Sequence, residues 1–300
     1  MLALRLPHLA LMMAVNLAWG LNFIAVKYAV DELPPVFATG LRFLLIFLLL
    51  LPVLRPVPGK MKDLLLAAIT IGAVHFSVLY YAISIADNMS SVAIATLTNV
   101  PFATILAVIF LRERIGIYSI SGLILAFTGV MVLGFDPRAF DQMTSLLLVM
   151  LAAFIYAVGA ILLRRLSGVG VFNLQAWIGV SGAIAVLGLS FLVESGQWPA
   201  LQVASWYAIG GVIFSSVFSS IIGHGGLYYL LKRYPVSTIT PLTLLSQVFA
   251  VIASILILGD VLTWRILLGG LLTFAGASII VYRKKQKAFG ALPADPEKRT

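Results

Sequence analysis

The sequence has no cysteine, and only 10% of its 300 residues are charged. The absence of cysteine excludes disulfides, thiolate metal sites and a cysteine nucleophile. With so little charge, 61% hydrophobic residues and a mean hydropathy of +1.08, the composition lies far outside that of water-soluble domains. These values predict a chain embedded in a membrane.

Sequence motifs for catalysis are also missing. The chain contains no P-loop, no H-E-x-x-H zinc helix and no credible nucleophile-base pair. We therefore expect no catalytic residues, no metal, no cofactor and no ATP hydrolysis by this chain alone. An intramembrane enzyme would need paired acids or a Ser-Lys dyad at membrane depth, and the sequence offers neither.

Ten apolar segments approach the roughly 20 residues that a membrane-spanning helix needs. They lie near residues 8–30, 34–54, 63–86, 89–111, 115–134, 144–163, 170–193, 203–231, 234–258 and 263–282. The least secure division separates the third from the fourth, where only Asp87 and Asn88 interrupt the apolar run. Short connections leave no room for a soluble domain. The sequence therefore predicts an all-α integral membrane protein of ten transmembrane helices.

Basic residues gather in alternate connections, which is typical of cytoplasmic loops. With the N-terminus inside, the inner connections carry Arg55, Lys60, Lys62, Arg112, Arg114, Arg164, Arg165, Lys232 and Arg233, and the outer ones carry Asp31, Glu32, Asp87, Asp136, Asp141, Glu194 and Asp260. Arg138 and Arg265 are the main exceptions. Both termini are predicted to be cytoplasmic. This topology explains the net charge of +9 without a nucleic-acid partner. We expect membrane lipid and a small molecule as partners. The oligomeric state stays open.

An internal repeat is visible when residues 90–133 are aligned with residues 237–280. The aligned pairs include Ser90 with Ser237, Leu97 with Leu244, Glu113 with Asp260, Gly122 with Gly269 and Gly129 with Gly276; one residue of slippage adds Tyr80-Tyr81 with Tyr228-Tyr229. The copies start five spans apart, and this odd number inverts the second copy relative to the first. Inverted repeats are typical of transporters whose halves rock about a midplane site; a duplication that only makes a stable bundle is the alternative.

The repeat divides the chain into four parts. We expect a first five-helix repeat (residues 1–134), a periplasmic linker (135–143), a second, inverted five-helix repeat (144–282) and a basic cytoplasmic tail (283–300).

Two segments carry a family resemblance. Residues Leu111-Arg112-Glu113-Arg114 running to Gly122 and Gly129, and Leu258-Gly259-Asp260 running to Gly269 and Gly276, resemble the two motif copies of the EamA branch of the drug/metabolite transporter superfamily. The resemblance extends from Trp19-Gly20 to the last helix, and within the branch it is greatest to YddG-type amino-acid exporters of the bacterial inner membrane. Arg112 and Asp260 depart from the usual pattern. The resemblance implies a ten-helix bundle with a central cavity and peripheral fifth and tenth helices.

No Asp or Glu lies well inside any predicted span, which disfavours a carboxylate-coupled antiporter. His75 and His224 remain as candidates for a proton relay or for neutral hydrogen-bonding groups. Arg42 lies about two turns into the second span, where an unpaired charge is costly; both a functional and a structural role are open. Lys27 could attract a carboxylate substrate or pair with Asp31 one turn away, and Arg164 occupies the corresponding last turn of the second repeat.

Polar residues at helical spacing predict a cavity lining, although small hydroxyl groups can also join helices to one another. Ser216, Ser220, His224 and Tyr228 recur every four residues in the eighth span, and Ser237, Thr240, Thr243 and Gln247 share roughly one face of the ninth, beside Pro241. Asn99 lies beside Pro101 in the fourth span, where a proline frees a carbonyl. Aromatic side chains, Tyr81 and Trp177 among them, could stack on a substrate or only pack. The substrate-binding candidates are Trp19, Asn22, His75, Tyr80, Asn99, Tyr156, Ser220, His224, Tyr228, Thr243 and Gln247.

The sequence thus predicts a secondary transporter or facilitator that exports amino acids or related metabolites, aromatic ones included, by alternating access across the bacterial inner membrane. The cargo and the direction rest on the resemblance. An exporter of cationic drugs would need an acidic cavity, and an exchanger of phosphorylated metabolites would need clustered cations at depth. A membrane scaffold that moves nothing is the alternative of another class.

Overall fold

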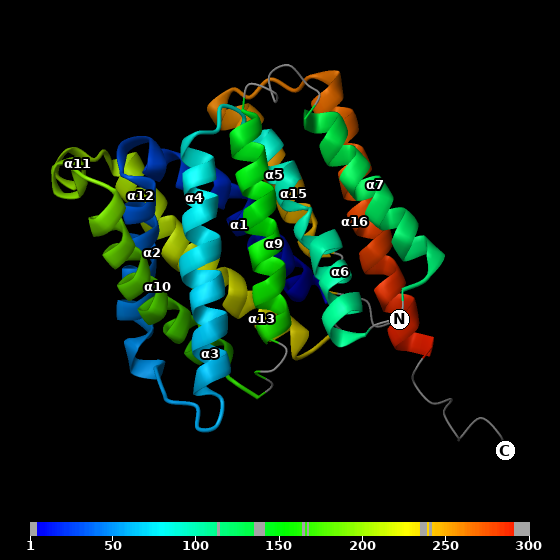
Figure 1. Ribbon diagram of the computed structural model, residues 1–300, viewed down its shortest axis with the longest axis horizontal. Coiled ribbons are helices and arrows are strands. Elements are labelled where there is room, and N and C mark those ends of the chain that lie inside the picture. Colours follow the sequence, from blue (N-terminus) through cyan, green and yellow to red (C-terminus); the bar gives the residue numbers. More distant parts are fainter. Residues whose placement is uncertain are drawn as a thin grey trace.

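The computed structural model describes residues 5–112, 115–134, 142–163, 166, 168–234, 239 and 242–290. Over these residues the chain is helical and has no strand, and Figure 1 shows the helices side by side in one bundle. Glu113, Arg114, Asp136, Arg138, Asp141, Arg164, Arg165, Ser237, Thr240 and Pro241, together with most of the expected linker and the end of the tail, lie outside the described residues.

Eight helices in the described part are long and apolar enough to cross a membrane. They are Leu6–Glu32, Pro35–Val53, Met61–Ser84, Met89–Phe110, Met143–Leu163, Val171–Val193, Trp206–Leu231 and Trp264–Tyr282. Two shorter apolar helices, Ile117–Leu133 and Leu245–Leu258, lie where the fifth and ninth spans are expected. The chain is therefore a multi-pass membrane protein.

Several spans change helical geometry along their length. The third consists of α3 (Met61–Ala68), the π-helical segment η2 (Ile69–His75) and α4 (Phe76–Ser84). The eighth consists of α12 (Trp206–Phe214), the π-helical segment η4 (Ser215–Gly223) and α13 (His224–Leu231). Such π segments occur often at functional sites.

The fourth span is broken at Leu97 and Thr98, between α5 (Met89–Thr96) and α6 (Asn99–Leu111). Pro101 has no N–H to donate to the carbonyl of Leu97, and the N–H of Val100 donates to this carbonyl instead, at 3.1 Å. The ninth span has a turn at Leu244 before α15 (Leu245–Ala253), which continues into the π-helical segment η5 (Ser254–Leu258). Both breaks leave irregular backbone in the bundle interior, where neighbouring groups can satisfy it.

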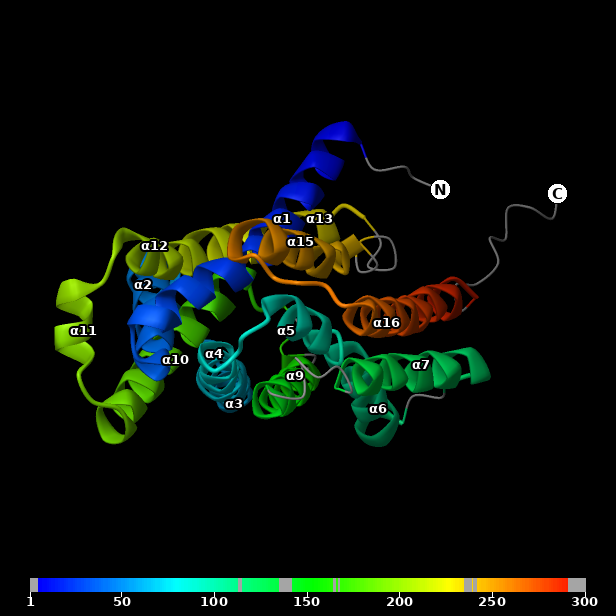
Figure 2. The same ribbon diagram turned by 90° about the horizontal axis from the view of Figure 1, so that it is seen from above.

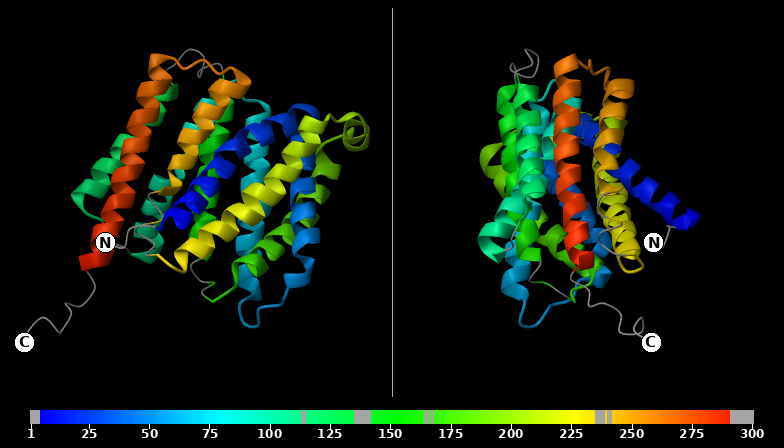
Figure 3. Two further views of the ribbon diagram at one scale, coloured as in Figure 1. Left: turned by 180° about the vertical axis from the view of Figure 1, so that it is seen from behind. Right: turned by 90° about the vertical axis from the view of Figure 1, so that its right-hand side faces the viewer.

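The helices form a central group and one outlying pair. In the central group α1 (Leu6–Glu32) packs on α12 and α15, α2 (Pro35–Leu50) packs on α10 (Val171–Val193), and α9 (Met143–Leu163) packs on α4 and α6. The pair α7 (Ile117–Gly134) and α16 (Trp264–Gly290) lies at one edge (Figure 2). The N-terminal half of α1 leans away from the other helices (Figure 3), and the side chains of Leu6 and Leu17 are exposed there.

The two ends of the bundle differ in charge. One end, which we name the acidic end, carries Asp31, Glu32, Asp87, Glu194 and Asp260 together with Lys27 and Arg265. The other, the basic end, carries Arg55, Lys60, Lys62, Arg112, Lys232 and Arg233 together with Asp63. At the acidic end Glu194, just after α10, accepts hydrogen bonds of 2.9 Å from the N–H groups of Val36 and Phe37 in the first turn of α2. A carboxylate in this position satisfies N–H groups that the helix itself leaves free.

This cap predicts a measurable contribution to stability. Replacing Glu194→Ala leaves both N–H groups at the start of α2 without their acceptor, and we expect a loss of about 1–2 kcal/mol. Thermal unfolding in detergent measures the change, with Glu194→Gln intermediate because its amide oxygen still accepts. Asp31→Ala is the matched control, since it removes an exposed ion pair worth about 0.2–1 kcal/mol. An equal effect of Asp31→Ala and Glu194→Ala would contradict the capping role.

Candidate functional site

A cavity of about 350 Å³ lies in the middle of the bundle. Its wall is formed by residues of α1, α2, η2, α4, α5, α6, α9, η4, α13 and α15, so segments from both predicted halves of the chain contribute. The volume lies within the ~300–1,000 Å³ range that is common for small-molecule sites. A second cavity of about 160 Å³ shares Arg42, Phe76, Tyr156, His224, Leu227 and Leu231 with the first. The two cavities are therefore neighbours around one set of side chains.

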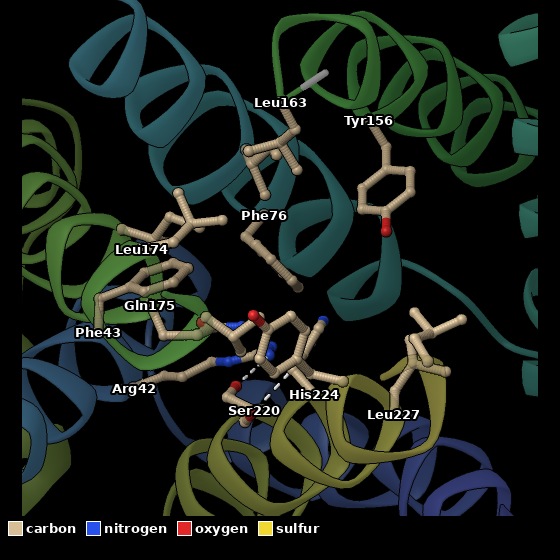
Figure 4. A pocket seen from close by; sticks show the side chains of 15 residues that line it. Arg42, Phe43, Phe76, Tyr156, Leu163, Leu174, Gln175, Ser220, His224 and Leu227 are labelled. Atoms are coloured by element: carbon tan, nitrogen blue, oxygen red, sulfur yellow. Dashed lines mark hydrogen bonds between the residues drawn. The ribbon is translucent and has the colours of Figure 1, made fainter. Parts of the chain in front are cut away.

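The smaller cavity extends toward the basic end. Its wall includes Leu163 and Leu231, the last residues of α9 and α13, and Val171, the first residue of α10. Figure 4 shows Tyr156 pointing from α9 into this space, while Arg42 and His224 enter it from α2 and α13. Polar and aromatic groups of distant segments thus surround the same space.

Ten of the eleven predicted site residues line one or both cavities. Trp19, Asn22, His75, Asn99, Tyr156, His224, Thr243 and Gln247 line the larger, and Tyr156, Ser220, His224 and Tyr228 line the smaller. Tyr80 lines neither: it is buried, and its hydroxyl accepts a hydrogen bond of 3.0 Å from Nη1 of Arg42. Tyr80 therefore positions a wall residue and does not itself face the space.

Arg42 is the most unusual side chain of the wall. Only 2% of it is exposed, and its Nη2 donates to Oγ of Ser220 at 2.8 Å. The guanidinium carbon lies 4.2 Å from the centre of the Phe76 ring, in cation-π contact. Its Nε has no partner among the described residues. These contacts fix the guanidinium in place with neutral groups alone.

Two histidines, His75 of η2 and His224 of α13, face the larger cavity. Nδ1 of His75 lies 2.8 Å from the carbonyl of Ala152, and Nδ1 of His224 lies 3.0 Å from the carbonyl of Ser220. Since a carbonyl only accepts, each Nδ1 carries the hydrogen, and the neutral form of each ring has Nε2 as an acceptor. The ring of His75 contacts that of Tyr156, with centroids 5.2 Å apart, and the ring of His224 contacts that of Trp19 at 5.4 Å. Both rings are thereby oriented for hydrogen bonding to a ligand.

The predicted stripe along the eighth span is only partly correct. Ser216 is buried, and its hydroxyl lies within hydrogen-bond distance of the carbonyls of Val212 (2.7 Å) and Arg42 (3.1 Å), so it joins α2 and does not line either cavity. Ser216 and Ser220 both lie in the π-helical segment η4, where the α-helical spacing that the prediction assumed does not apply. The helix-joining alternative therefore holds for Ser216.

Three other candidates lie away from the cavities. Nε1 of Trp177 donates to the carbonyl of Arg55 at 3.0 Å, and Tyr81 is 49% exposed on the bundle surface. Lys27 pairs with Asp31 at 2.6 Å, as the local alternative predicted. None of these three residues contributes to the wall of either cavity.

Sequence reasoning left Arg42 and Phe76 out of the candidate set, although both line both cavities. A signal for Arg42 was present, because it is a charge inside an apolar span. Phe76 gives no comparable signal among 18 phenylalanines.

The fold and the cavity define a helical membrane protein with an internal polar site, as in transporters. The model of the EamA-like transporter family matches residues 6–135 and 143–282. The chain belongs to this family, and its substrate is accordingly a small molecule.

Individual relatives agree with this assignment. A protein of Salmonella typhimurium named "Probable amino-acid metabolite efflux pump" is 30% identical over 283 residues, with 91% of this chain and 94% of the relative covered. An Escherichia coli protein of the same name is 28% identical over 282 residues, with 91% and 94% covered. An uncharacterized transporter of Archaeoglobus fulgidus is 30% identical over 276 residues, with 89% and 95% covered. A crystal structure with 17% identity superimposes with a TM-score of 0.60 over 94% of this chain and 99% of the other, and it supports the fold alone.

Proposed function

We propose that the chain is a secondary transporter that exports amino acids or closely related metabolites across the bacterial inner membrane by alternating access. The observation that carries the proposal is the cavity between the two repeats, whose wall combines aromatic rings, amide groups, two histidines and one buried cation. Two relatives named as amino-acid metabolite efflux pumps support the cargo and the direction. The predicted site residues that line the cavities are the proposed contacts of the substrate.

The mechanism requires ten spans in two inverted halves, residues 1–134 and 144–282, joined by a linker at 135–143. Contacts between α7 and α16 support the inversion. A Cβ on Gly122 would lie 2.9 Å from the carbonyl oxygen of Gly276, and one on Gly129 would lie 2.6 Å from that of Gly269. In the aligned repeat, Gly122 corresponds to Gly269 and Gly129 corresponds to Gly276. The contact between Gly122 and Gly276 therefore corresponds to the contact between Gly269 and Gly129. A two-fold axis that relates the two halves requires this correspondence.

The cavity wall follows the same rule. The His75–Tyr156 contact joins the third and sixth spans, and the His224–Trp19 contact joins the eighth and first. The third span corresponds to the eighth and the sixth to the first, so the two contacts are equivalent if the halves are related by a two-fold axis. The breaks at Leu97 and Leu244, which are aligned in the repeat, both line the larger cavity. Discontinuous helices that meet at a midplane site are a feature of inverted-repeat transporters, and the family model matches one segment in each half.

The charge difference between the ends supports an orientation. We infer that the basic end, with both termini and the residues 283–300, faces the cytoplasm because basic residues are retained there. The smaller cavity extends toward that end, and hydrogen bonds between helices close the acidic end. In this orientation the structure corresponds to an inward-facing state.

The alternatives fit the cavity less well. No Asp or Glu is among the described wall residues, so an organic cation would find no counter-ion there. A phosphate group would meet one arginine where clustered cations are needed. A scaffold would need no cavity between its halves. Amino-acid-like cargo therefore remains the best match.

Uptake by proteoliposomes tests the proposal. The purified chain should accumulate radiolabelled amino acids, aromatic ones included, above empty liposomes. Uptake should be indifferent to a pH gradient if the chain is a facilitator, because the described part of the wall has no carboxylate to couple a proton. His224→Ala should lower uptake by about tenfold, since one hydrogen bond to the substrate is worth about 1.4 kcal/mol. His8→Ala, outside both cavities, is the matched control and should match the parent. Absence of uptake for every amino acid and for their N-acyl derivatives would overturn the cargo.

A further inference from the structure

Arg42 is a buried cation without a counter-ion. Its side chain is 2% exposed, and it makes no ion pair with any described carboxylate. Tyr80, Ser220 and the ring of Phe76 contact it, and all three are neutral. A guanidinium has five N–H donors, and the hydrogen bonds to Tyr80 and Ser220 account for two of them. Neutral contacts offset only part of the cost of burying a charge at membrane depth.

The buried charge also lies beside the space that a ligand would occupy. Arg42 lines both cavities, and it is the only Lys, Arg, Asp or Glu among the described wall residues. Its Nε is buried and has no partner among the described residues, so one donor of the guanidinium stays unsatisfied. The cavity therefore has a formal charge of +1 when both histidines are neutral, and it lacks the group that would cancel this charge.

We propose that the substrate supplies the missing charge: it enters the cavity as a net monoanion whose carboxylate pairs with Arg42, and its amine is absent or acylated. This inference rests on the proposed transport function and narrows its cargo to N-acyl amino acids and related apolar or aromatic carboxylates. A planar guanidinium pairs well with a carboxylate through two parallel hydrogen bonds.

The rest of the wall favours a masked amine over a free ammonium group. An ammonium would add a second positive charge to a cavity that already has one and would find no described carboxylate to pair with. A neutral amide N–H needs only an acceptor, and Oδ1 of Asn22 in the larger cavity is a buried acceptor with no described partner. A phosphate would add about −1.5 to −2 charges and would leave the site with excess negative charge. The rings of Trp19, Phe23 and Tyr156 can take the apolar body.

A matched series of four compounds tests the charge requirement. Phenylalanine is a zwitterion, N-acetylphenylalanine an anion, phenylalanine amide a cation and N-acetylphenylalanine amide neutral, with the same benzyl group in all. Titration calorimetry on the purified full chain should give the tightest binding for N-acetylphenylalanine, at least tenfold tighter than phenylalanine, with the two amides weakest. In proteoliposomes the same order should hold for competition with uptake.

Variants assign the effect to Arg42. Arg42→Gln should weaken binding of N-acetylphenylalanine at least tenfold and remove its advantage over the neutral amide, while Arg42→Lys should keep the order. Arg55→Gln, the same change at an exposed position outside both cavities, should behave as the parent.

The outcomes separate this inference from the transport function. If the parent protein binds phenylalanine or phenylalanine amide more tightly than N-acetylphenylalanine, the inference is wrong, but amino-acid transport is not contradicted. This comparison uses the parent protein alone and so does not depend on the folding of a variant. The inference is also wrong if folded Arg42→Gln binds the four compounds in the same order of affinity as the parent. If the parent neither binds nor takes up any of the four compounds, the proposed cargo itself is wrong.

Discussion

A disulfide between positions 90 and 260 is expected to abolish transport, and its reduction is expected to restore it. Ser90 lies in the first turn of α5 at the acidic end, and its N–H and hydroxyl both donate to Oδ2 of Asp260, at 2.6 and 2.8 Å. Asp260 follows Gly259, whose φ of +73° favours glycine and turns the chain toward α5. These hydrogen bonds join α5 to the segment between η5 and α16, at the acidic end.

Alternating access requires this end to separate while the other end closes. The pair Ser90→Cys with Asp260→Cys can be oxidised cleanly, because the chain has no other cysteine. Uptake by proteoliposomes should fall to the level of empty liposomes on oxidation and recover with a reductant. Each single cysteine variant should be insensitive to oxidation.

A second pair controls for oxidation at the same helix terminus. Asn88→Cys with Ser91→Cys lies at the start of α5, where the two side chains meet at 2.9 Å, and bridges no other element. Its oxidation should leave transport unchanged. Full transport by the oxidised 90–260 variant would show that the acidic end does not open between these positions, and the proposed mechanism would be wrong.

The positions of the spans could be predicted from sequence because they follow from local composition. A run of apolar residues near 20 long has few alternatives to a membrane helix, and the predicted and observed ends agree within a few residues for the eight long helices. The internal geometry could not be predicted in the same way. The π-helical segments η2 and η4 depend on contacts between helices, and nothing local marks Ile69 or Ser215 as the start of a wider turn.

The sequence alone was enough to predict which residue types form the site, but not which residues contact one another in it. Polar and aromatic groups inside apolar spans are few, so most candidates point to one cavity. The role of Arg42 depends on Tyr80 and Ser220, which are 38 and 178 residues away along the chain. A spacing rule within one helix cannot identify such partners. The same limit explains Ser216, whose partner is the backbone of α2.

Alanine at Gly129 or Gly276 is expected to destabilise the protein markedly, because backbone atoms of the facing helix occupy the space of the added carbon. A Cβ on Gly129 would meet the backbone N of Thr273 and lie 2.6 Å from the carbonyl oxygen of Gly269. A Cβ on Gly276 would meet the backbone N of Ala126 and lie 2.6 Å from the carbonyl oxygen of Gly122. Since backbone cannot rotate aside, α7 and α16 must separate, at a cost of about 1–3 kcal/mol per substitution.

Reversible unfolding in detergent measures this cost. Gly188→Ala is the matched control: Gly188 lies exposed within α10 and has no atom within 4 Å of an added Cβ. Its stability should stay the same or rise, because alanine favours a helix over glycine by about 1 kcal/mol. Equal effects of Gly188→Ala and Gly129→Ala would contradict close packing between α7 and α16.

Double variants distinguish the two contacts along this pair of helices. Gly129 and Gly269 meet each other, so alanine at both should cost less than the sum of the single costs, because the first substitution already separates the helices there. Gly122 and Gly129 lie seven residues apart, about 10.5 Å along α7, and their costs should be nearly additive. If the two halves are related by a two-fold axis, the pair Gly122 and Gly276 should deviate from additivity by the same amount as the pair Gly129 and Gly269. Different couplings would mean that the repeat does not extend to the packing of its last helices.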